Sequence, residues 1–394
     1  MSLYKYMQEL LENNLKAGQK RQIVAKEQFG SKIIVDNTEY VNLSSNDYIG
    51  LGSNLEVSQD FLSNLPKDAL RQSSSGSPLL TGAHPSYQRA TDAMEKLFHK
   101  SALFFDSGFA ANSGTIEALA TPNNLIIADK LSHASIIEGM MTAKGKTMRF
   151  AHNNITHLKT LLDKFSKDFD SVIIATEAIF SMDGDEAPLK ELVEIKHQYD
   201  NVYLYVDEAH SFCLYNDNGA GLCAKYGITE DVDFILTTFG KGLGSQGACM
   251  LCNEIAKNYL INTARSLIFS TALSPYAFAH IAYMVEYMQK RNDLRQRLHT
   301  ITHAIHETLN EVNLENVSVS QIIPILTYEN EKALEACQFF KENGFYAMPI
   351  RHPTVPKGQA RLRLSLSANL TDSEVNKLQE TIKAFAKTSA PTKG

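Results

Sequence analysis

Short apolar runs alternate with amphipathic stretches through the middle of the chain. Runs such as "NLIIAD", "SVIIATEAIF" and "VYLYVDEAH" have the length of buried strands, and stretches such as "HASIIEGMMTA" and "APLKELVEIKHQY" carry apolar residues at helical spacing. Near-continuous apolar strands are typical of parallel sheets that helices cover on both faces. The pattern therefore predicts an α/β fold, in which ligands bind at the carboxyl ends of the strands.

Both ends of the chain have a different pattern. Residues 1–25 carry apolar positions at helical spacing, and "KIIVDNTEYVNLSS" predicts a hairpin that turns at Asp36-Asn37. After Pro275, a long helical stretch over 276–312 precedes two short strands, "SQIIPILTY" and "ARLRLSLSA", and a terminal helix. These features predict a second, smaller α+β domain.

The length of 394 residues exceeds what one hydrophobic core usually supports. We therefore expect three parts. Residues 46–285 form a large domain with a mostly parallel sheet covered by helices, and 286–394 form a small C-terminal domain. Residues 1–45 form an N-terminal segment that packs with the small domain.

Composition and charge exclude several classes of protein. The net charge of -6 argues against a nucleic-acid partner, which would require a basic surface. No apolar run reaches the ~20 residues that cross a bilayer, and the start of the chain lacks the features of a signal peptide. The five cysteines, an odd number, predict reduced thiols and a cytoplasmic location. Cys249 and Cys252 form a C-x-x-C motif, but no second pair completes a zinc site.

Polar residues follow two neighbouring predicted strands. In "VYLYVDEAH", Asp207 follows the apolar run directly and His210 comes three residues after it. In "FILTTFGK", Thr238 and Lys241 stand at the end of the next strand. Asp207 taken alone could also be a helix N-cap, although the ligand crevice is the favoured interpretation. Together, these side chains would meet at one edge of the sheet. A lysine for a Schiff base, an acid for a pyridine nitrogen and hydroxyls for a phosphate predict a site for pyridoxal 5'-phosphate (PLP).

Two further loops could contribute to this site. In "FFDSGFAANSG" a strand runs through Gly108 and Phe109 into a helix, whose free N–H groups suit a phosphate. A strand-turn-helix without a ligand is about as common. His133 lies in another strand-to-helix loop, where an imidazole can stack on a flat ring, although a capping or surface histidine is the simpler interpretation.

Two motifs indicate other chemistry. Residues 242–247 fit the dinucleotide fingerprint G-x-G-x-x-G, but the strand-like "ACMLCN" follows where that motif needs a helix. His299, His303 and His306 have spacings that put them on one helix face. No acidic partner of the H-E-x-x-H type accompanies them, so we expect a solvated or packing face and no metal site.

Seven segments carry a family resemblance. They are "SSNDYIGL" (44–51), "SGFAAN" (107–112), "SHASIIEGM" (132–140), "FSMDGDEAPL" (180–189), "VDEAHSF" (206–212), "TTFGKGLGSQG" (237–247) and "RHPTVPKGQARLRLSLSA" (351–368). In this order they resemble the α-oxoamine synthase family of fold-type I PLP enzymes. The resemblance implies the fold of PLP-dependent transferases, a homodimer, and the decarboxylative condensation of an amino acid with an acyl thioester.

The resemblance also implies a role for each matching residue. Lys241 is the Schiff-base lysine and the catalytic base, Asp207 pairs with the pyridine nitrogen, and His133 stacks on the ring and donates a hydrogen bond in catalysis. The other cofactor residues are Gly108, Phe109, Glu177, Ser181, His210 and Thr238. The other substrate residues are Asn46, Arg351, Thr354 and an N-terminal basic residue, Arg21 or its neighbour Lys20.

The last of the seven segments bears on the substrates. It most resembles the members that join L-alanine to a pimeloyl thioester carried by CoA or an acyl carrier protein. Pro78 and Tyr87 depart from the family pattern near the acyl entrance, and Gly240 stands where the family usually has serine. Glycine C-acetyltransferase, synthases that use serine or long-chain thioesters, and a non-catalytic protein of the same fold are the alternatives.

Overall fold

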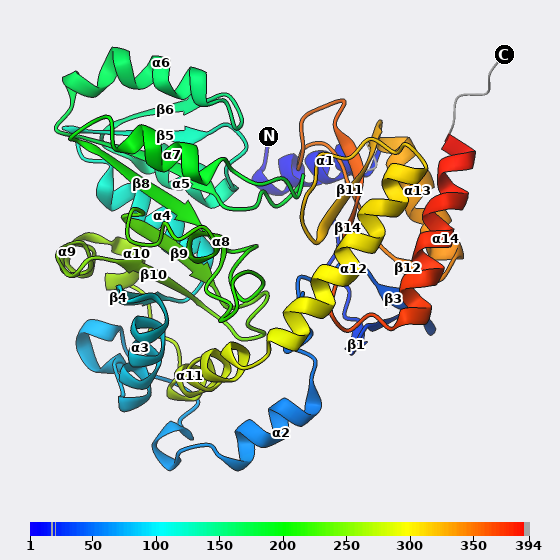
Figure 1. Cartoon of the computed structure of the whole chain (residues 1–394), viewed down its shortest axis with the longest axis horizontal. Coiled ribbons are helices and arrows are strands. Elements are labelled where there is room, and N and C mark those ends of the chain that lie inside the picture. Colours follow the sequence, from blue (N-terminus) through cyan, green and yellow to red (C-terminus); the bar gives the residue numbers. More distant parts are fainter. Residues whose placement is uncertain (17–18, 20, 390–394) are drawn as a thin grey trace.

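A seven-stranded sheet forms the centre of the large domain in the computed structural model, which describes residues 1–16, 19 and 21–389 (Figure 1). The strand order is β4 (Ser101–Phe105), β10 (Ala248–Cys252), β9 (Phe234–Thr238), β8 (Val202–Asp207), β7 (Ser171–Glu177), β5 (Asn124–Asp129) and β6 (Lys146–Phe150). The strands from β9 to β6 pair in parallel, and β10 is antiparallel to both of its neighbours. The predicted α/β fold with a mostly parallel sheet is confirmed.

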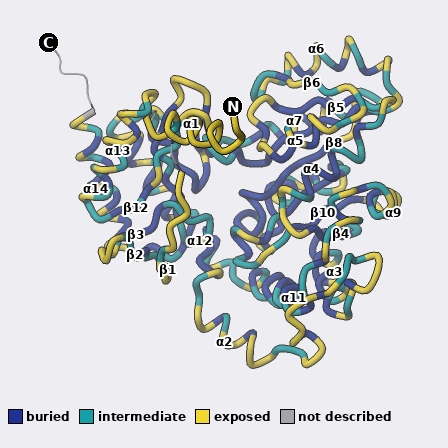
Figure 2. Tube along the Cα trace, turned by 180° about the vertical axis from the view of Figure 1, so that it is seen from behind, coloured by how far each residue is buried: buried dark blue, intermediate teal, exposed yellow. Residues whose placement is uncertain are grey.

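The inner strands of this sheet consist mainly of buried residues (Figure 2), and these belong to two hydrophobic clusters, one on each face. In β5, Leu125 and Ile127 belong to one hydrophobic cluster, whereas Ile126 and Ala128 belong to the other. No position between the ends of β5 faces water, which explains its near-continuous apolar sequence. Polar side chains in these strands are therefore confined mainly to the strand ends.

Helices cover both faces of the sheet. Residues of α4 (Gly108–Leu119), α5 (Ala134–Thr142), α9 (Glu254–Thr263) and α10 (Arg265–Ile268) belong to one cluster. The other cluster contains residues of α3 (Pro85–Phe98), α6 (Ile155–Phe165), α7 (Leu189–Lys196), α8 (Leu222–Lys225) and α11 (Pro275–Gln289). Ser107, Asn154 and Ser274 cap α4, α6 and α11, because each side-chain oxygen accepts a backbone N–H of the first turn.

The small domain contains two further sheets. One is antiparallel and consists of β11 (Ile322–Tyr328), β14 (Ala360–Ser365) and β13 (Met348–Ile350). The other joins β1 (Glu27–Phe29), β2 (Lys32–Val35) and β3 (Thr38–Asn42) to β12 (Phe345–Tyr346), so the N-terminal segment shares a sheet with the C-terminal part of the chain. The domain boundaries at 45 and 285 stay predictions.

The remaining helices lie around these sheets (Figure 1). They are α12 (Asn292–Glu311), α13 (Asn330–Glu342), α14 (Asp372–Ser389), α1 (Leu3–Lys16), α2 (Leu55–Ser63) and three short helices, η1 (Lys67–Ala69), η2 (Pro78–Gly82) and η3 (Ser166–Asp168). α1 has no buried residue. No helix within the described ranges is long and apolar enough to cross a bilayer.

Several elements differ from the sequence prediction. The single helix expected over 276–312 is two helices, because Arg291 between them has φ -105° and ψ 50°. The sequence analysis also missed β6, α6, β12, β13 and α13. β6 is an edge strand in which only Phe150 is buried, so it lacks an apolar run. α13 buries only Ala333, Ala336 and Phe340, which leaves a weak helical pattern.

The alternative motifs do not form sites in the described residues. Cys249 and Cys252 belong to different hydrophobic clusters, and burial raises the pKa of both thiols. His299 and His306 each contact a different backbone carbonyl, and His303 is exposed. Across 1–16, 19 and 21–389, no group of three His, Cys, Asp or Glu side chains is arranged to hold a metal ion.

The lysine-bearing loop connects two strands. β10 follows its glycines where a dinucleotide fingerprint would need a helix, so that interpretation is wrong. Gly244 in this loop has φ +65°, and a Cβ there would lie 2.4 Å from the backbone N of Gly52. The loop therefore contacts the segment before α2 too closely for any side chain at this position.

We expect Gly244→Ala to reduce the free energy of unfolding by clearly more than the ~1–2 kcal/mol that a left-handed backbone alone costs an alanine. The matched control is Gly227→Ala, because Gly227 has φ +69° but open space where a Cβ would lie, with no contacting atom within 4 Å. Urea denaturation of the two variants measures the difference. If the two variants lost the same free energy of unfolding, the close contact with Gly52 would contribute nothing to the loss.

Candidate active site

A cavity of about 370 Å³ lies at the carboxyl ends of β7, β8 and β9. Its lining includes most of the residues that the sequence analysis selected: Asn46, Gly108, Phe109, His133, Glu177, Asp207, His210, Thr238 and Lys241. The sheet register pairs Glu177 directly with Asp207, and Asp207 with a residue of β9. Strand pairing thus brings together side chains that lie far apart in the sequence.

Hydrogen bonds hold the Asp207 carboxylate in one orientation. Oδ2 accepts from the Asn112 amide at 2.7 Å, and Oδ1 accepts from the backbone N–H of Ala209 at 2.9 Å. The amide is fixed in turn, because the Tyr205 hydroxyl donates to its oxygen at 2.6 Å. A carboxylate held in this way is an acceptor for a protonated ring nitrogen.

His133 stands at the N-cap of α5 with its proton position set by neighbours. Its Nδ1 accepts from the backbone N–H of Ser135 at 3.2 Å and from the Ser135 hydroxyl at 2.7 Å, while that hydroxyl accepts from Asn112. Burial lowers the pKa of His133, which favours the neutral ring. These bonds assign the ring proton to Nε2, which leaves an N–H donor for a ligand.

Lys241 begins a chain of hydrogen bonds. Its Nζ donates to Nε2 of His210 at 2.8 Å, and Nδ1 of His210 is 2.7 Å from the Tyr48 hydroxyl. That hydroxyl donates to Oδ1 of Asn46 at 3.0 Å. Since Nε2 of His210 accepts from the lysine, Nδ1 carries the ring proton and donates to Tyr48.

Burial controls the charge of the cavity. It lowers the pKa of Lys241 to about 8, although the carboxylates of Asp207 and Glu177 act in the opposite direction. Burial also holds the pKa of His210 well below its ordinary value and raises that of Glu177 well above it. About a tenth of the lysine amine is therefore unprotonated at pH 7, and about half at pH 8.

The opposite end of the cavity suits a phosphate. The Thr238 hydroxyl is shielded from water and makes no hydrogen bond within the described chain. A Cβ on Gly108 would lie 2.5 Å from the Thr238 methyl group, so only glycine lets the first turn of α4 approach this closely. Free N–H groups and the helix dipole at that turn attract an anion, and the unpaired hydroxyl adds a donor. These residues fit PLP.

Three residues of the site escaped the sequence analysis: Asn112, Tyr48 and Arg363. The Arg363 guanidinium in β14 donates to Asn46 Oδ1 at 3.3 Å and to the Tyr48 hydroxyl at 3.3 Å, and its Nε donates to the carbonyl of Ser181 at 2.7 Å. The alternation in "ARLRLS" could have indicated that arginines share one face of this strand. Its position beside the cavity depends on how the small domain meets the sheet.

Four predicted residues lie outside the lining of this cavity. Ser181 and Thr354 line a second cavity of about 450 Å³ next to α5. Arg21 reaches this second cavity, since its Nη2 donates to the Thr354 hydroxyl at 3.1 Å. Arg351 lies on the loop of Thr354, and its carbonyl accepts the Thr354 N–H at 2.9 Å. Lys20, the alternative to Arg21, lies outside the described residues. All of these assignments stay predictions.

Two of the family departures, Pro78 and Tyr87, line the same small cavity, and the third, Gly240, does not. The Tyr87 ring packs edge-on against Phe104 and Phe278, with ring centroids 5.4 and 5.0 Å apart, so its main role is in the core. Pro78 is the first residue of η2. Gly240 lines the first cavity beside Lys241.

Comparison with known proteins identifies the family. The model for aminotransferase class I and II matches residues 38–382. The chain belongs to this family. The 8-amino-7-oxononanoate synthase of Haemophilus ducreyi is 42% identical to it over 381 residues, which cover 95% of this chain and 98% of the relative. The predicted α-oxoamine synthase resemblance is confirmed, and the PLP dependence of the family confirms the predicted cofactor.

Solved structures of this family share the fold. The 8-amino-7-oxononanoate synthase of Francisella tularensis is 28% identical, covers 89% of this chain and 99% of its own, and has a TM-score of 0.75. A serine palmitoyltransferase variant from S. paucimobilis with bound PLP and myriocin is 24% identical, covers 98% of this chain and 99% of its own, and has a TM-score of 0.89. The latter likeness concerns the fold alone.

We expect the apoprotein to take up PLP faster as the pH rises through about 8. Only the unprotonated amine of Lys241 can bond to an aldehyde carbon, and burial lowers its pKa from 10.5 to about 8. Stopped-flow absorbance of the bound cofactor measures this rate, with Lys241→Arg as the variant that forms no covalent bond. A rate that continues to rise toward the ordinary lysine pKa would contradict the burial effect.

Proposed function

We propose that the protein is an 8-amino-7-oxononanoate synthase, which joins L-alanine to a pimeloyl thioester with loss of CO2 and the thiol. The convergence of Lys241, Asp207 and His133 in one cavity carries this proposal. The 42% identity to the Haemophilus ducreyi enzyme over most of both chains supports the choice of substrates. The same arrangement of residues would serve glycine C-acetyltransferase and related synthases, which the experiment below separates.

Three groups of residues would hold PLP. Lys241 would bond to the aldehyde carbon, and the fixed Asp207 carboxylate would accept the ring N–H. The first N–H groups of α4 and the unpaired Thr238 hydroxyl would bind the phosphate. When bound, PLP supplies an electron-withdrawing ring that stabilises negative charge on the substrate α-carbon.

Lys241 moves the proton at the α-carbon of the amino acid. When it is not bonded to the cofactor, Nζ would be free to act as a base, and its pKa of about 8 leaves a useful unprotonated fraction. The neutral His210 accepts a hydrogen bond from Nζ and so keeps the amine close to the reacting carbon. The hydroxyl of Tyr48 fixes that imidazole from its other nitrogen.

Two donors meet the negative charge of the substrates. Arg363 contacts Asn46 at the cavity wall, where its guanidinium can bind the amino acid carboxylate. His133 has a free Nε2–H, whose hydrogen bond strengthens as negative charge develops on the thioester oxygen. Both donors are fixed before substrate arrives, because Ser181 and Ser135 hold them through hydrogen bonds.

The acyl group would occupy the second cavity. Ser132 and Ala134 line it on either side of His133, which lines the first cavity, so a single loop separates the two. The apolar side chains of its wall, Leu131, Ile137, Met141, Val355 and Pro356, suit a methylene chain. Thr354 and Arg21 offer polar groups for the rest of the thioester, whose carrier is CoA or a carrier protein.

We also infer a cytoplasmic homodimer. α1 exposes its apolar side chains, among them Leu3, Tyr4 and Leu11, and Phe109 at the first cavity is 50% exposed. A second copy of the chain would cover such surfaces, and the resemblance to homodimeric synthases supports this arrangement.

The screen combines each of L-alanine, glycine and L-serine with each of an acetyl, a pimeloyl and a long-chain thioester. We expect the PLP-loaded protein to turn over L-alanine with the pimeloyl thioester faster than any other pair. Thiol release measures each rate. Lys241→Ala should reduce kcat by a factor of ~10²–10⁴, which is the usual contribution of a positioned base. Lys257→Ala, which removes a lysine paired with Glu95, is the control and should retain activity.

The screen also decides between the alternatives. Glycine with acetyl-CoA as the best pair would indicate glycine C-acetyltransferase, and a long-chain thioester with serine would indicate a sphingoid-base type of synthase. A protein that binds PLP on Lys241 but turns over no pair would be a non-catalytic member of the fold.

A further inference from the structure

The segment between β7 and α7 folds into a hairpin that contacts both domains. Phe180 N–H donates to the carbonyl of Asp185 at 3.0 Å, and the N–H of Ala187 donates to the carbonyl of Ala178 at 3.2 Å. We call residues 178–187 the hairpin. Its tip supplies Phe180, Ser181, Met182 and Asp183 to the wall of the second cavity.

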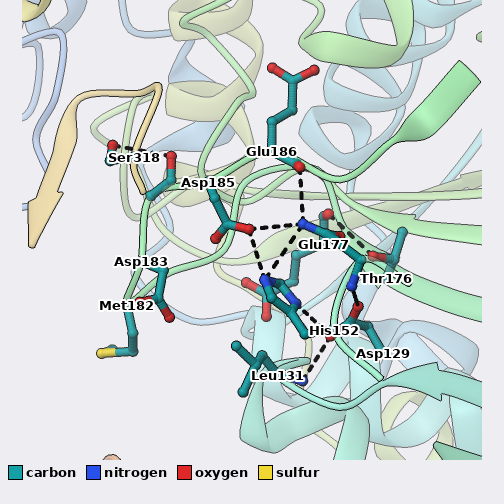
Figure 3. Close-up of polar contacts among 12 residues, drawn as sticks. Asp129, Leu131, His152, Thr176, Glu177, Met182, Asp183, Asp185, Glu186 and Ser318 are labelled. Atoms are coloured by element: carbon teal, nitrogen blue, oxygen red, sulfur yellow. Dashed lines mark hydrogen bonds and ion pairs between the residues drawn. The ribbon is translucent and has the colours of Figure 1, made fainter. Parts of the chain in front are cut away.

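His152, just after β6, lies between the carboxylate of Asp129, at the end of β5, and that of Asp185 in the hairpin (Figure 3). Nδ1 is 2.9 Å from Asp129 Oδ1, and Nε2 is 2.8 Å from Asp185 Oδ2. The imidazole also packs edge-on against Phe180, with ring centroids 4.4 Å apart. One side chain therefore joins the end of β5 to both strands of the hairpin.

The neighbouring residue reinforces this connection. The Asn153 side chain donates to Asp185 Oδ2 at 2.8 Å and to the carbonyl of Glu186 at 3.1 Å, and its backbone N–H donates to Asp129 Oδ2 at 2.8 Å. The Glu186 carboxylate is directed elsewhere, because it accepts from the Tyr226 hydroxyl. Asp129 and Asp185 are thus the carboxylates that face His152.

The positive charge at this point comes from the imidazole. Among the described residues, neither Asp129 nor Asp185 forms an ion pair with lysine or arginine. Burial lowers the pKa of His152, but the hydrogen bonds and charges of both carboxylates outweigh burial and raise the pKa to about 10. His152 is consequently an imidazolium below that pH, and neither ring nitrogen is available to exchange a proton with a substrate.

The opposite side of the hairpin contacts the small domain. Arg361 forms an ion pair with Asp183, and Nε of Arg363 donates to the carbonyl of Ser181 at 2.7 Å. The Ser318 hydroxyl donates to the carbonyl of Gly184 at 3.2 Å. The hairpin is therefore the element through which the β5–β6 edge of the sheet holds the small domain.

We propose that His152 is a positioning residue for the acyl-transfer half of the reaction, because it fixes the hairpin that forms one wall of the second cavity. This inference rests on the proposed function. Asp207, Thr238 and Lys241 come from β8, β9 and the following loop. Arg363 is also held by Asn46 and Tyr48, which lie outside the hairpin, so the half of the site that binds PLP and the amino acid keeps its contacts without the hairpin. Loss of the imidazolium should therefore affect the two halves unequally.

The test compares His152→Gln with wild-type holoenzyme in two assays. Exchange of the α-proton of L-alanine in D2O, without thioester, reports on the cofactor half, and condensation with a pimeloyl thioester reports on both halves. We expect the KM for the thioester to rise about tenfold to a hundredfold, which is the typical effect of a displaced positioning group. The rate of α-proton exchange should stay within about twofold of the wild-type rate. The ratio of wild-type to variant activity should be constant between about pH 7 and 9, because the imidazolium does not titrate there.

Two further variants sharpen the comparison. His197→Gln makes the same residue change as His152→Gln but breaks an exposed ion pair with Asp231. This control variant should alter the result of neither assay. Asp185→Asn keeps the shape of the hairpin and an oxygen acceptor but removes its charge, so the KM for the thioester should rise in the same direction by about threefold or more.

Three results would overturn the inference. They are an unchanged KM for the thioester in both His152→Gln and Asp185→Asn, an equal loss of exchange and condensation, or a wild-type to variant ratio of activity that changes with pH. If wild-type enzyme itself exchanged no α-proton of L-alanine, the proposed function would be wrong, and the inference that rests on it would fall with it.

Discussion

The register of three parallel strands, β7, β8 and β9, decides where the ionisable groups of the candidate active site lie. Glu177 at the end of β7 pairs with Asp207 at the end of β8, and Asp207 pairs with Leu236 two residues before β9 ends at Thr238. The interiors of these strands are largely buried on both faces, so polar side chains are tolerated mainly where the strands end. A slip of one residue in one strand would turn its terminal side chain to the other face of the sheet.

Burial then sets the protonation of what the strands bring together. It raises the pKa of Glu177 and lowers those of Lys241, His210 and His133, and all of these shifts favour neutral groups. The cavity therefore combines a neutral imidazole donor with an amine close to its pKa at neutral pH. Asp207 accepts two hydrogen bonds, which hold its carboxylate toward the place where a cationic ring nitrogen would lie.

The small domain completes this site without contributing to the central sheet. Arg363 reaches Asn46 and Tyr48 from β14, and the hairpin between β7 and α7 holds the same arginine through Ser181. His152 fixes the other side of the hairpin. A change at the β6 end of the sheet can thus alter the wall of the second cavity, which the hairpin supplies.

The sequence by itself determined the α/β architecture, because buried parallel strands require uninterrupted apolar runs, and it selected Asp207, Lys241 and Thr238, because polar residues directly after such runs lie at one sheet edge. It did not determine β6 or α13, whose exposed or short apolar patterns resemble loops. Only the tertiary structure separated Ser181 and Thr354 into a second cavity and brought Arg363 and His152 to the site. Those positions depend on contacts between residues far apart in the sequence, within the large domain for His152 and between the domains for Arg363, and periodicity along a chain carries no information about such contacts.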